Sequence, residues 1–183
     1  MVNNKPAYLW FVSPTQINMQ APDDTATGIV NVAVTTSAGT ATSTVTLAPA
    51  SPAFLLLDAT HVAGFIVHSD QTTDILGPTG TSLGYRTVAA KAGDVVELFG
   101  IGFGPTNPAV PAGHVFSGAA TTKNAVQVQI GSTNVNPSFT GISGAGLYQI
   151  NLTIPPGLGT GDKALLATVA GVQTQSTVVI SLQ

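Results

Sequence analysis

The residues best suited to bind a metal ion or to transfer a proton lie within one short segment, from Asp58 to Asp74. The segment holds two histidines, His61 and His68, and three aspartates, Asp58, Asp70 and Asp74. On one continuous strand the histidines would face opposite sides, because an odd number of positions separates them. Asp70 and Asp74 offer the oxygen ligands that Ca²⁺ prefers, but the alternating aspartates of a Ca²⁺-binding loop are absent. We expect turn-forming aspartates and surface histidines here, with Ca²⁺ binding at Asp70 and Asp74 as the alternative.

Asp23 and Asp24 form a second acidic pair, directly after Pro22. Proline and aspartate both favour turns, so we expect a turn here as well, again with Ca²⁺ binding as the alternative. The sequence predicts no other metal site and no cofactor. It contains no cysteine, which excludes disulfides and thiolate ligands.

Glu97 is the only glutamate and lies in the otherwise apolar run Val95–Phe99. Glycoside hydrolysis by paired carboxylates needs a second acid about 5–10 Å away. Asp94 is near in sequence, but its odd spacing from Glu97 places it on the other face of a strand. We therefore expect Glu97 to face outward from an edge strand.

The stretch Gly100–Pro105 resembles a phosphate-binding loop only in its glycines. Such a loop needs a helix to begin directly after it, and the proline-rich segment Pro105–Pro108 follows instead. We expect a tight turn between strands, in which glycine supplies a positive φ. No G-x-S-x-G elbow marks a serine nucleophile. We predict no catalytic residue and a protein that is not an enzyme.

Charge and composition exclude several classes of protein. Only 7% of the 183 residues are charged, with five Lys plus Arg against eight Asp plus Glu. Five basic residues give no electrostatic surface for nucleic acid. No apolar run approaches the roughly 20 residues that span a membrane, so we expect no membrane insertion. The 44% hydrophobic content argues against disorder.

Alternation of apolar and polar residues with a period of two is the dominant pattern of the chain. It predicts strands whose ranges are 30–35, 44–47, 126–130 and 147–154, followed by a closing hairpin made of 164–169 and 174–182. No segment has the cap, the apolar helical period and the stop signal of a helix. The fold class is predicted to be all-β.

An internal repeat divides the chain into two unequal parts. The segment 15–47 aligns with the segment 148–180 without gaps, and ten of the aligned positions are identical. The shared unit is a strand ending in Gln-Ile-Asn, a turn marked by proline, and a final hairpin. We predict two antiparallel β-sandwich modules. Residues 1–48 form a partial module that lacks its opening strands, and residues 49–183 form a complete one.

The partial module is too short to bury a self-sufficient core. We expect its apolar face to pack on the second module, on another copy of the chain, or on upstream sequence. Tyr8, Trp10 and Phe11 are the densest aromatic group, and we expect them in this core or interface, with a sugar-stacking platform as the alternative. The first residues do not resemble a signal peptide, and we expect a fragment of a larger exported protein.

A family resemblance extends along most of the chain. The stretches that carry it are Lys5–Tyr8, Phe11–Asn18, Gln20–Asp24, Ser51–Phe54, His68–Asp70, Gly93–Phe99, Gly102–Thr106 and Gly146–Asn151. Together they resemble a bacterial C-terminal domain family that is abundant in large secreted acidobacterial proteins and has the motifs YVSPTQIN, GFGPT and GLYQIN. The stretch Gly93–Pro105 is also similar to the immunoglobulin-like fold of the TIG type. The resemblance implies exported, immunoglobulin-like modules and brings no established activity. Unlike the family, this chain has no upstream strands for its first module.

These observations predict a non-catalytic, extracellular or cell-surface module with a structural or adhesive role. Its partners would be other domains of the parent protein or copies of itself. Edge strands are commonly protected by charged residues, above all lysine, and the chain has only four lysines. One alternative is therefore a self-assembling subunit, a dimer or filament completed by strands of neighbouring chains. A further alternative is a carbohydrate-binding accessory module.

Overall fold

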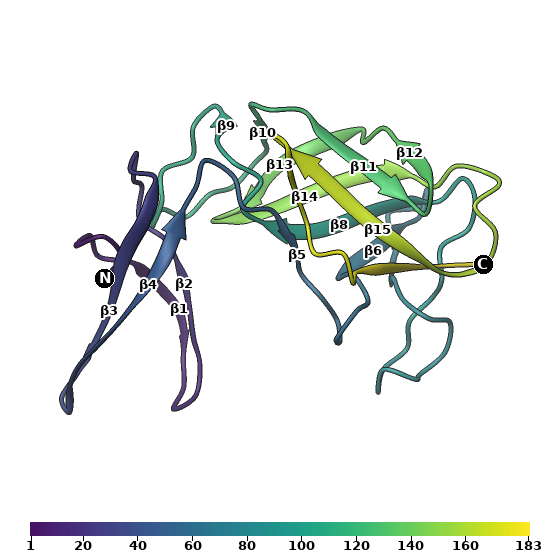
Figure 1. Ribbon diagram of the computed structural model, residues 1–183. Coiled ribbons are helices and arrows are strands. Elements are labelled where there is room, and N and C mark those ends of the chain that lie inside the picture. Colours follow the sequence, from purple (N-terminus) through teal and green to yellow (C-terminus); the bar gives the residue numbers. More distant parts are fainter.

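The computed structural model describes all residues from 1 to 183 and contains strands but no helix (Figure 1). The all-β prediction is therefore confirmed. The strands are β1 (Tyr8–Val12), β2 (Ile17–Gln20), β3 (Gly28–Thr36), β4 (Gly39–Leu47), β5 (Ala53–Phe54), β6 (Gly64–Val67), β7 (Thr73–Ile75), β8 (Val95–Ile101), β9 (Thr106–Asn107), β10 (Ala120–Thr122), β11 (Val126–Ile130), β12 (Thr133–Val135), β13 (Phe139–Gly144), β14 (Leu147–Thr153), β15 (Gly161–Val169), β16 (Val172–Gln173) and β17 (Val179–Leu182).

The first four strands form two separate antiparallel hairpins. β1 pairs with β2, and β3 pairs with β4 along the whole length of each strand. In Figure 1 the two hairpins lie to one side of the remaining strands and spread apart at their turns. Neither hairpin joins a larger sheet.

The remaining strands form a β-sandwich of two antiparallel sheets. The larger sheet has the order β7-β6-β8-β14-β13-β10-β9, with β5 also on β8, and the smaller has the order β12-β11-β15-β16, with β17 also on β15. Between the sheets lies a core of 22 buried residues, all from the part of the chain between Ala50 and Leu182. Along each strand, polar residues alternate with these core residues and point outward, as the alternation predicts.

The glycine-rich stretch after β8 is not the tight turn between strands that the sequence predicts: residues 102–105 form an irregular connection to β9, which lies at the far edge of the same sheet. Gly102 and Gly104 both have positive φ, at 73° and 88°. A Cβ on Gly102 would overlap the carbonyl oxygen of Ser51, whose backbone N–H donates a 2.9 Å hydrogen bond to the Gly102 carbonyl. The glycines thus allow this connection to pack against the segment that leads into β5.

The predicted closing hairpin forms, but its second strand is interrupted. β16 and β17 are separated at Thr174–Val178. Here the side-chain amide of Gln175 accepts a 2.9 Å hydrogen bond from the Phe54 N–H and donates a 3.0 Å bond to the Phe54 carbonyl. Thr174 and Val178 still bond to β15, through the Ala167 carbonyl and the Leu165 N–H, both at 2.9 Å. The chain therefore leaves β15 only around Gln175, which bonds to β5 across the sandwich. No helix in the structure is long and apolar enough to cross a membrane.

Candidate functional site

The repeat detected in the sequence has a counterpart in the pairing of the strands. Thr35 pairs with Thr40 in the first hairpin, and at the equivalent place in the second copy Thr168 pairs with Gln173. The side-chain amide of Gln16 donates to Asn18 at 2.7 Å, and that of Gln149 donates to Asn151 at 2.9 Å. The equivalent elements are β2 with β14, β3 with β15, and β4 with β16 and β17.

Equivalent apolar side chains differ greatly in exposure between the two copies. In the first copy, Ile17, Met19, Val34 and Val45 are 41%, 42%, 40% and 43% exposed. Their counterparts Ile150, Leu152, Ala167 and Val178 are 1%, 0%, 0% and 0% exposed. We call the four residues of the first copy the open face. It is an apolar surface that the second copy buries inside its sandwich.

The neighbouring strands account for this difference in burial. β14 pairs with β8 as well as β13, whereas β2 pairs only with β1. β15 pairs with β11 along the whole of β11. On β3 this edge is covered only at its centre, where Val2 bridges Val32, the Ala33 N–H donates to the Met1 carbonyl and the Asn3 N–H donates to the Asn31 carbonyl, both at 2.9 Å. The first copy thus has one free edge at β2 and one partly covered edge at β3.

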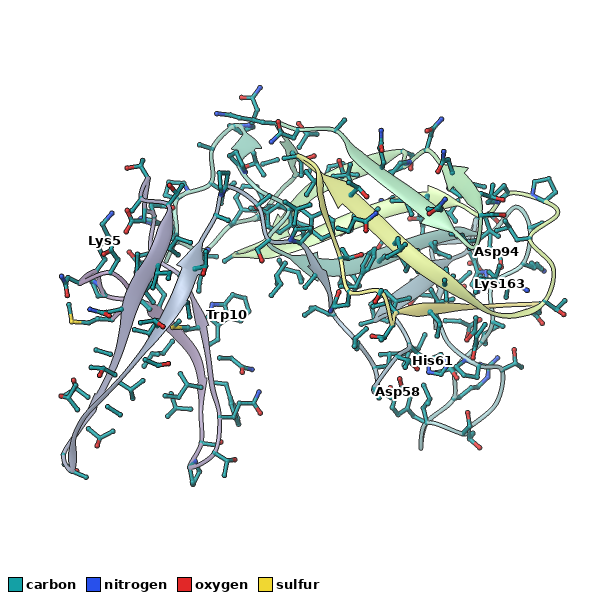
Figure 2. All side chains as sticks on the ribbon, in the orientation of Figure 1. Lys5, Trp10, Asp58, His61, Asp94 and Lys163 are labelled. Atoms are coloured by element: carbon teal, nitrogen blue, oxygen red, sulfur yellow. The ribbon has the colours of Figure 1, made fainter.

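The three aromatic residues singled out in the sequence all lie on β1 and remain exposed. Tyr8, Trp10 and Phe11 are 41%, 62% and 50% exposed. Tyr8 lies against Gly113, where a Cβ would overlap its ring. In Figure 2, Trp10 projects from the hairpins on the side that faces the sandwich.

An open groove of about 480 Å³ lies between β1 and the loop after β9. Its polar and aromatic lining consists of Tyr8, Trp10, Gln20 and His114. The groove is bridged at Gln20, whose side-chain oxygen accepts a 3.0 Å hydrogen bond from the Gly113 N–H. An exposed indole beside amide and imidazole groups is able to stack on a sugar ring and to bond its hydroxyls.

The carboxylates of Asp23 and Asp24 bind different groups of the protein and do not form one site. The Asp23 carboxylate accepts a 3.0 Å hydrogen bond from the Ala112 N–H, which links the hairpins to the sandwich. Asp24 binds Asn3 at 2.8 Å and Lys5 at 3.2 Å. The Ala26 N–H and the Asn3 side chain donate to this carboxylate and lower its pKa to about 2.

His61 lies beside Asp58 at the lower end of the sandwich in Figure 2, and a second carboxylate, that of Asp162, lies on its other side. Its Nδ1 is 2.8 Å from Asp58 and its Nε2 is 3.3 Å from Asp162, which in turn accepts a 2.7 Å hydrogen bond from Ser181. Burial acts to lower the pKa of His61, but hydrogen bonds and charge from Asp58 and then Asp162 outweigh it, so the pKa is raised. The N–H groups of His61 and Thr60 lower the pKa of Asp58 to about 2.

Asp70 and Asp74 bind different partners. Asp70 accepts hydrogen bonds from the hydroxyl and the backbone N–H of Thr72, at 2.6 and 3.0 Å, and these lower its pKa. Asp74 lies 3.0 Å from His68 and 3.3 Å from Arg86. No group of three or more His, Asp or Glu side chains in the structure is arranged to hold a metal ion.

The prediction that Glu97 lies on an edge strand is wrong, although the side chain does point away from the core. β8 is an inner strand, flanked by β6 and β14. Glu97 pairs with Phe65 on one side and Asn151 on the other. β14 lies far downstream of β8 in the sequence, and local pattern does not reveal a flanking strand that pairs over so long a range.

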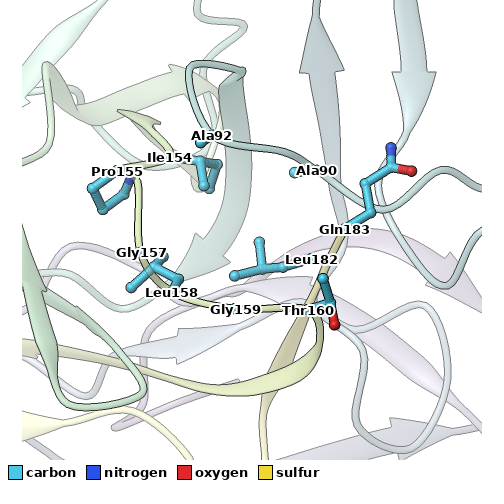
Figure 3. A pocket seen from close by; sticks show the side chains of 10 residues that line it. All are labelled: Ala90, Ala92, Ile154, Pro155, Gly157, Leu158, Gly159, Thr160, Leu182 and Gln183. Atoms are coloured by element: carbon cyan, nitrogen blue, oxygen red, sulfur yellow. The ribbon is translucent and has the colours of Figure 1, made fainter.

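A second, smaller hollow of about 150 Å³ lies at the end of the sandwich near the C-terminus (Figure 3). Ile154, Leu158 and Leu182 give it an apolar lining, and Thr160 and Gln183 lie at its margin. Ligand pockets usually have volumes of about 300–1,000 Å³. This hollow is below that range and carries no convergent charged groups.

Sequence reasoning did not find Val2, Asp162 or Ser181. Asp162 lies 101 residues from His61, and no local pattern links positions so far apart. The alignment of the repeat contained no signal for Val2 either, because it begins at position 15. Compared with known protein families, curated proteins and solved structures, the chain gives no match.

Proposed function

We propose that the chain is a non-catalytic, extracellular structural or adhesive module, in which immunoglobulin-like sandwiches follow one another as part of a larger secreted or surface protein. The observation that carries this proposal is the tandem repetition of one strand–turn–hairpin unit. The residue pairing between β3 and β4 recurs in the second copy between β15 and β16. Repeated sandwiches of this kind are typical of cell-surface spacers.

The surface chemistry supports the same role. Strands β1 to β4 contain no charged residue, and the aspartates of the chain bind neighbouring backbone and side-chain groups. A rigid body with an uncharged, hydroxyl-rich surface contacts neighbours through many weak hydrogen bonds.

Fractionation of the source cells tests the proposal. An antibody against residues 49–183 is expected to detect a polypeptide larger than 18.4 kDa in the exported or surface fraction. Detection of an 18.4 kDa polypeptide in the cytoplasm alone would contradict it.

A second candidate function is carbohydrate binding at the groove between β1 and the loop after β9, favoured by the 62% exposure of Trp10 beside Gln20 and His114. A glycan array and calorimetry with the best oligosaccharide test it. Trp10→Ala is expected to abolish binding, whereas Tyr85→Ala, which removes an aromatic ring 39% exposed elsewhere, is expected to preserve it. The absence of any bound glycan, or equal loss in both variants, would reject this function.

A further inference from the structure

The open face is one side of a hydrophobic core without its other side. Its four residues are 40–43% exposed, and their counterparts one repeat later are at most 1% exposed. The second module does not cover the open face within the chain. In the partial module, only Val2 and Val30 are buried.

We propose that the open face binds the open face of a second copy of this chain, and that β2 of one copy pairs antiparallel with β2 of the other across a twofold axis. The two copies then form one closed sandwich from four hairpins. This inference goes beyond the proposed structural role, because it names the partner and the strand that joins it.

The repeat identifies the geometry that the missing neighbour must have. One repeat later, Ile150 and Leu152 pair with Leu98 and Val96 of β8, which runs antiparallel to β14. Two identical strands related by a twofold axis perpendicular to them are also antiparallel. Pairing of β2 with its own copy therefore reproduces the strand direction found in the complete sandwich.

The chain itself carries strands with the pattern of the missing neighbours. β11, which covers β15, has the sequence Val-Gln-Val-Gln-Ile, and its three apolar residues are at most 7% exposed. Within β3, the segment 30–34 reads Val-Asn-Val-Ala-Val. The strand that a second copy adds at the β2 edge has the same alternation, with Ile17 and Met19 apolar and Asn18 and Gln20 polar.

No electrostatic repulsion opposes contact between the two open faces. The four strands β1 to β4 contain no charged residue, so two identical faces meet without like-charge repulsion. An edge strand without lysine, proline or other charge is open to pairing with another strand. β2, with the sequence Ile-Asn-Met-Gln, is such an edge.

The available area matches that of a stable dimer. Ten large apolar side chains of strands β1 to β4 are 40–78% exposed. Aromatic side chains bury roughly 150–250 Å² each and aliphatic ones somewhat less, so the exposed surface of the ten is on the order of 1,000 Å². Because side chains alternate between faces, about half of it faces the partner. If interfaces are roughly 60% apolar, this corresponds to about 800 Å² per chain, the usual size for a specific complex.

β2 is the edge at which the copies join, because the equivalent edge of β3 is already partly covered. Val2 occupies the centre of the β3 edge and is only 2% exposed. β2 has no such cover, since its only strand partner is β1. The dimer therefore forms without displacement of the residues around Val2.

Sedimentation velocity of the full chain from about 1 to 100 µM tests the proposal. The expected result is a dimer that dissociates on dilution. Met19→Lys, which places two ammonium groups near the twofold axis, is expected to weaken the dimer by at least about tenfold. The matched control is Val172→Lys on the sandwich, which has the same 42% exposure and is expected to change the dissociation constant less than about twofold.

Single cysteines locate the contact without competing thiols, because the chain has none of its own. Asn18→Cys and Gln20→Cys each place a thiol on β2, and at least one is expected to form an intermolecular disulfide faster than Val172→Cys. Each variant reports the register in which its own position lies at the twofold axis, since a disulfide needs Cα atoms about 4.4–6.8 Å apart.

Three results would overturn the proposal: a monomer at every concentration, an open-ended series of larger oligomers, or equal cross-linking at β2 and at position 172. Cross-linking is measured on the unmodified open face, so it remains decisive if Met19→Lys disturbs folding. A monomeric chain would leave the proposed structural role intact, because that role depends on the export of the sandwich and not on its dimerisation.

Discussion

Val2 forms an antiparallel bridge with Val32 at the position where, one repeat later, Ile130 pairs with Leu165. Both residues are buried, with 2% exposure for Val2 and 0% for Ile130. The start of the chain, from Met1 to Asn3, therefore acts as a short substitute for β11. It covers the centre of β3 and leaves the rest of the first copy open.

Replacement of Val2 by aspartate should detach this substitute strand. A carboxylate cannot be buried at this place without a partner. We expect the amides of Asn3 and Ala33, which donate to Asn31 and Met1, to lose protection in hydrogen exchange. The melting temperature of the sandwich should not change.

Val115→Asp is the control for this substitution, because Val115 is 99% exposed. Protection of the two amides should be the same as in the unmodified chain. If Val2→Asp also left their exchange unchanged, the substitute-strand interpretation would be wrong.

Equivalent isoleucines of the two copies should differ in their contribution to stability. Ile150→Ala removes a side chain that is 1% exposed and is expected to lower the free energy of unfolding of the sandwich by about 2–5 kcal/mol. Ile17→Ala, at 41% exposure, should cost less than about 1 kcal/mol in a monomer. Urea denaturation in a Met19→Lys background, where the dimer is weakened, measures both. Similar losses would contradict the difference in burial.

Gly102→Ala should destabilise the sandwich more than Gly157→Ala. Both glycines have positive φ, at 73° and 85°, so alanine carries a similar backbone cost of about 1–2 kcal/mol at either place. Only at Gly102 would the added Cβ overlap a neighbour, the carbonyl oxygen of Ser51. Thermal denaturation of the two variants isolates this overlap. Equal melting temperatures would show that the connection after β8 accommodates a side chain.

The cluster around His61 should make the sandwich more stable in mild acid. Because the pKa of His61 is raised above 6.5, its contribution is fully present below pH 6.5 and is lost as the pH rises through the folded value. The pKa of Asp58 is about 2, so this partner stays ionised over the same range. Melting temperatures between about pH 5.5 and 8.5 should fall less steeply for His61→Gln than for the unmodified chain.

His68 and His114 are retained in that variant, so their contribution is common to both proteins. Identical pH profiles would mean that Asp58 and Asp162 do not stabilise the protonated imidazole of His61.

Much of the fold follows from local pattern. Period-two alternation predicted β11 and β15 because Val128, Ile130 and Leu165 each face the core between polar or less buried neighbours. Local pattern did not predict the break between β16 and β17, since it arises when Gln175 bonds to Phe54, 121 residues away. The inner position of Glu97 was missed for the same reason.

The open face was predicted from the sequence in part. The repeat indicated that Ile17 belongs to an incomplete core, and its exposure of 41% agrees with a missing neighbour. The repeat could not indicate that Val2 covers β3, because residues before position 15 lie outside the aligned segment. That contact depends on the path of the chain through three dimensions.

Hydrogen exchange of the β2 amides as a function of protein concentration tests the central claim most directly. The amides of Ile17–Gln20 that point away from β1 have no strand partner within the chain. If two copies pair there, these amides should become protected as the concentration rises through the dissociation constant, while those of β14 stay constant. Fast exchange of the β2 amides at every concentration would contradict the closure of the open face by a second copy.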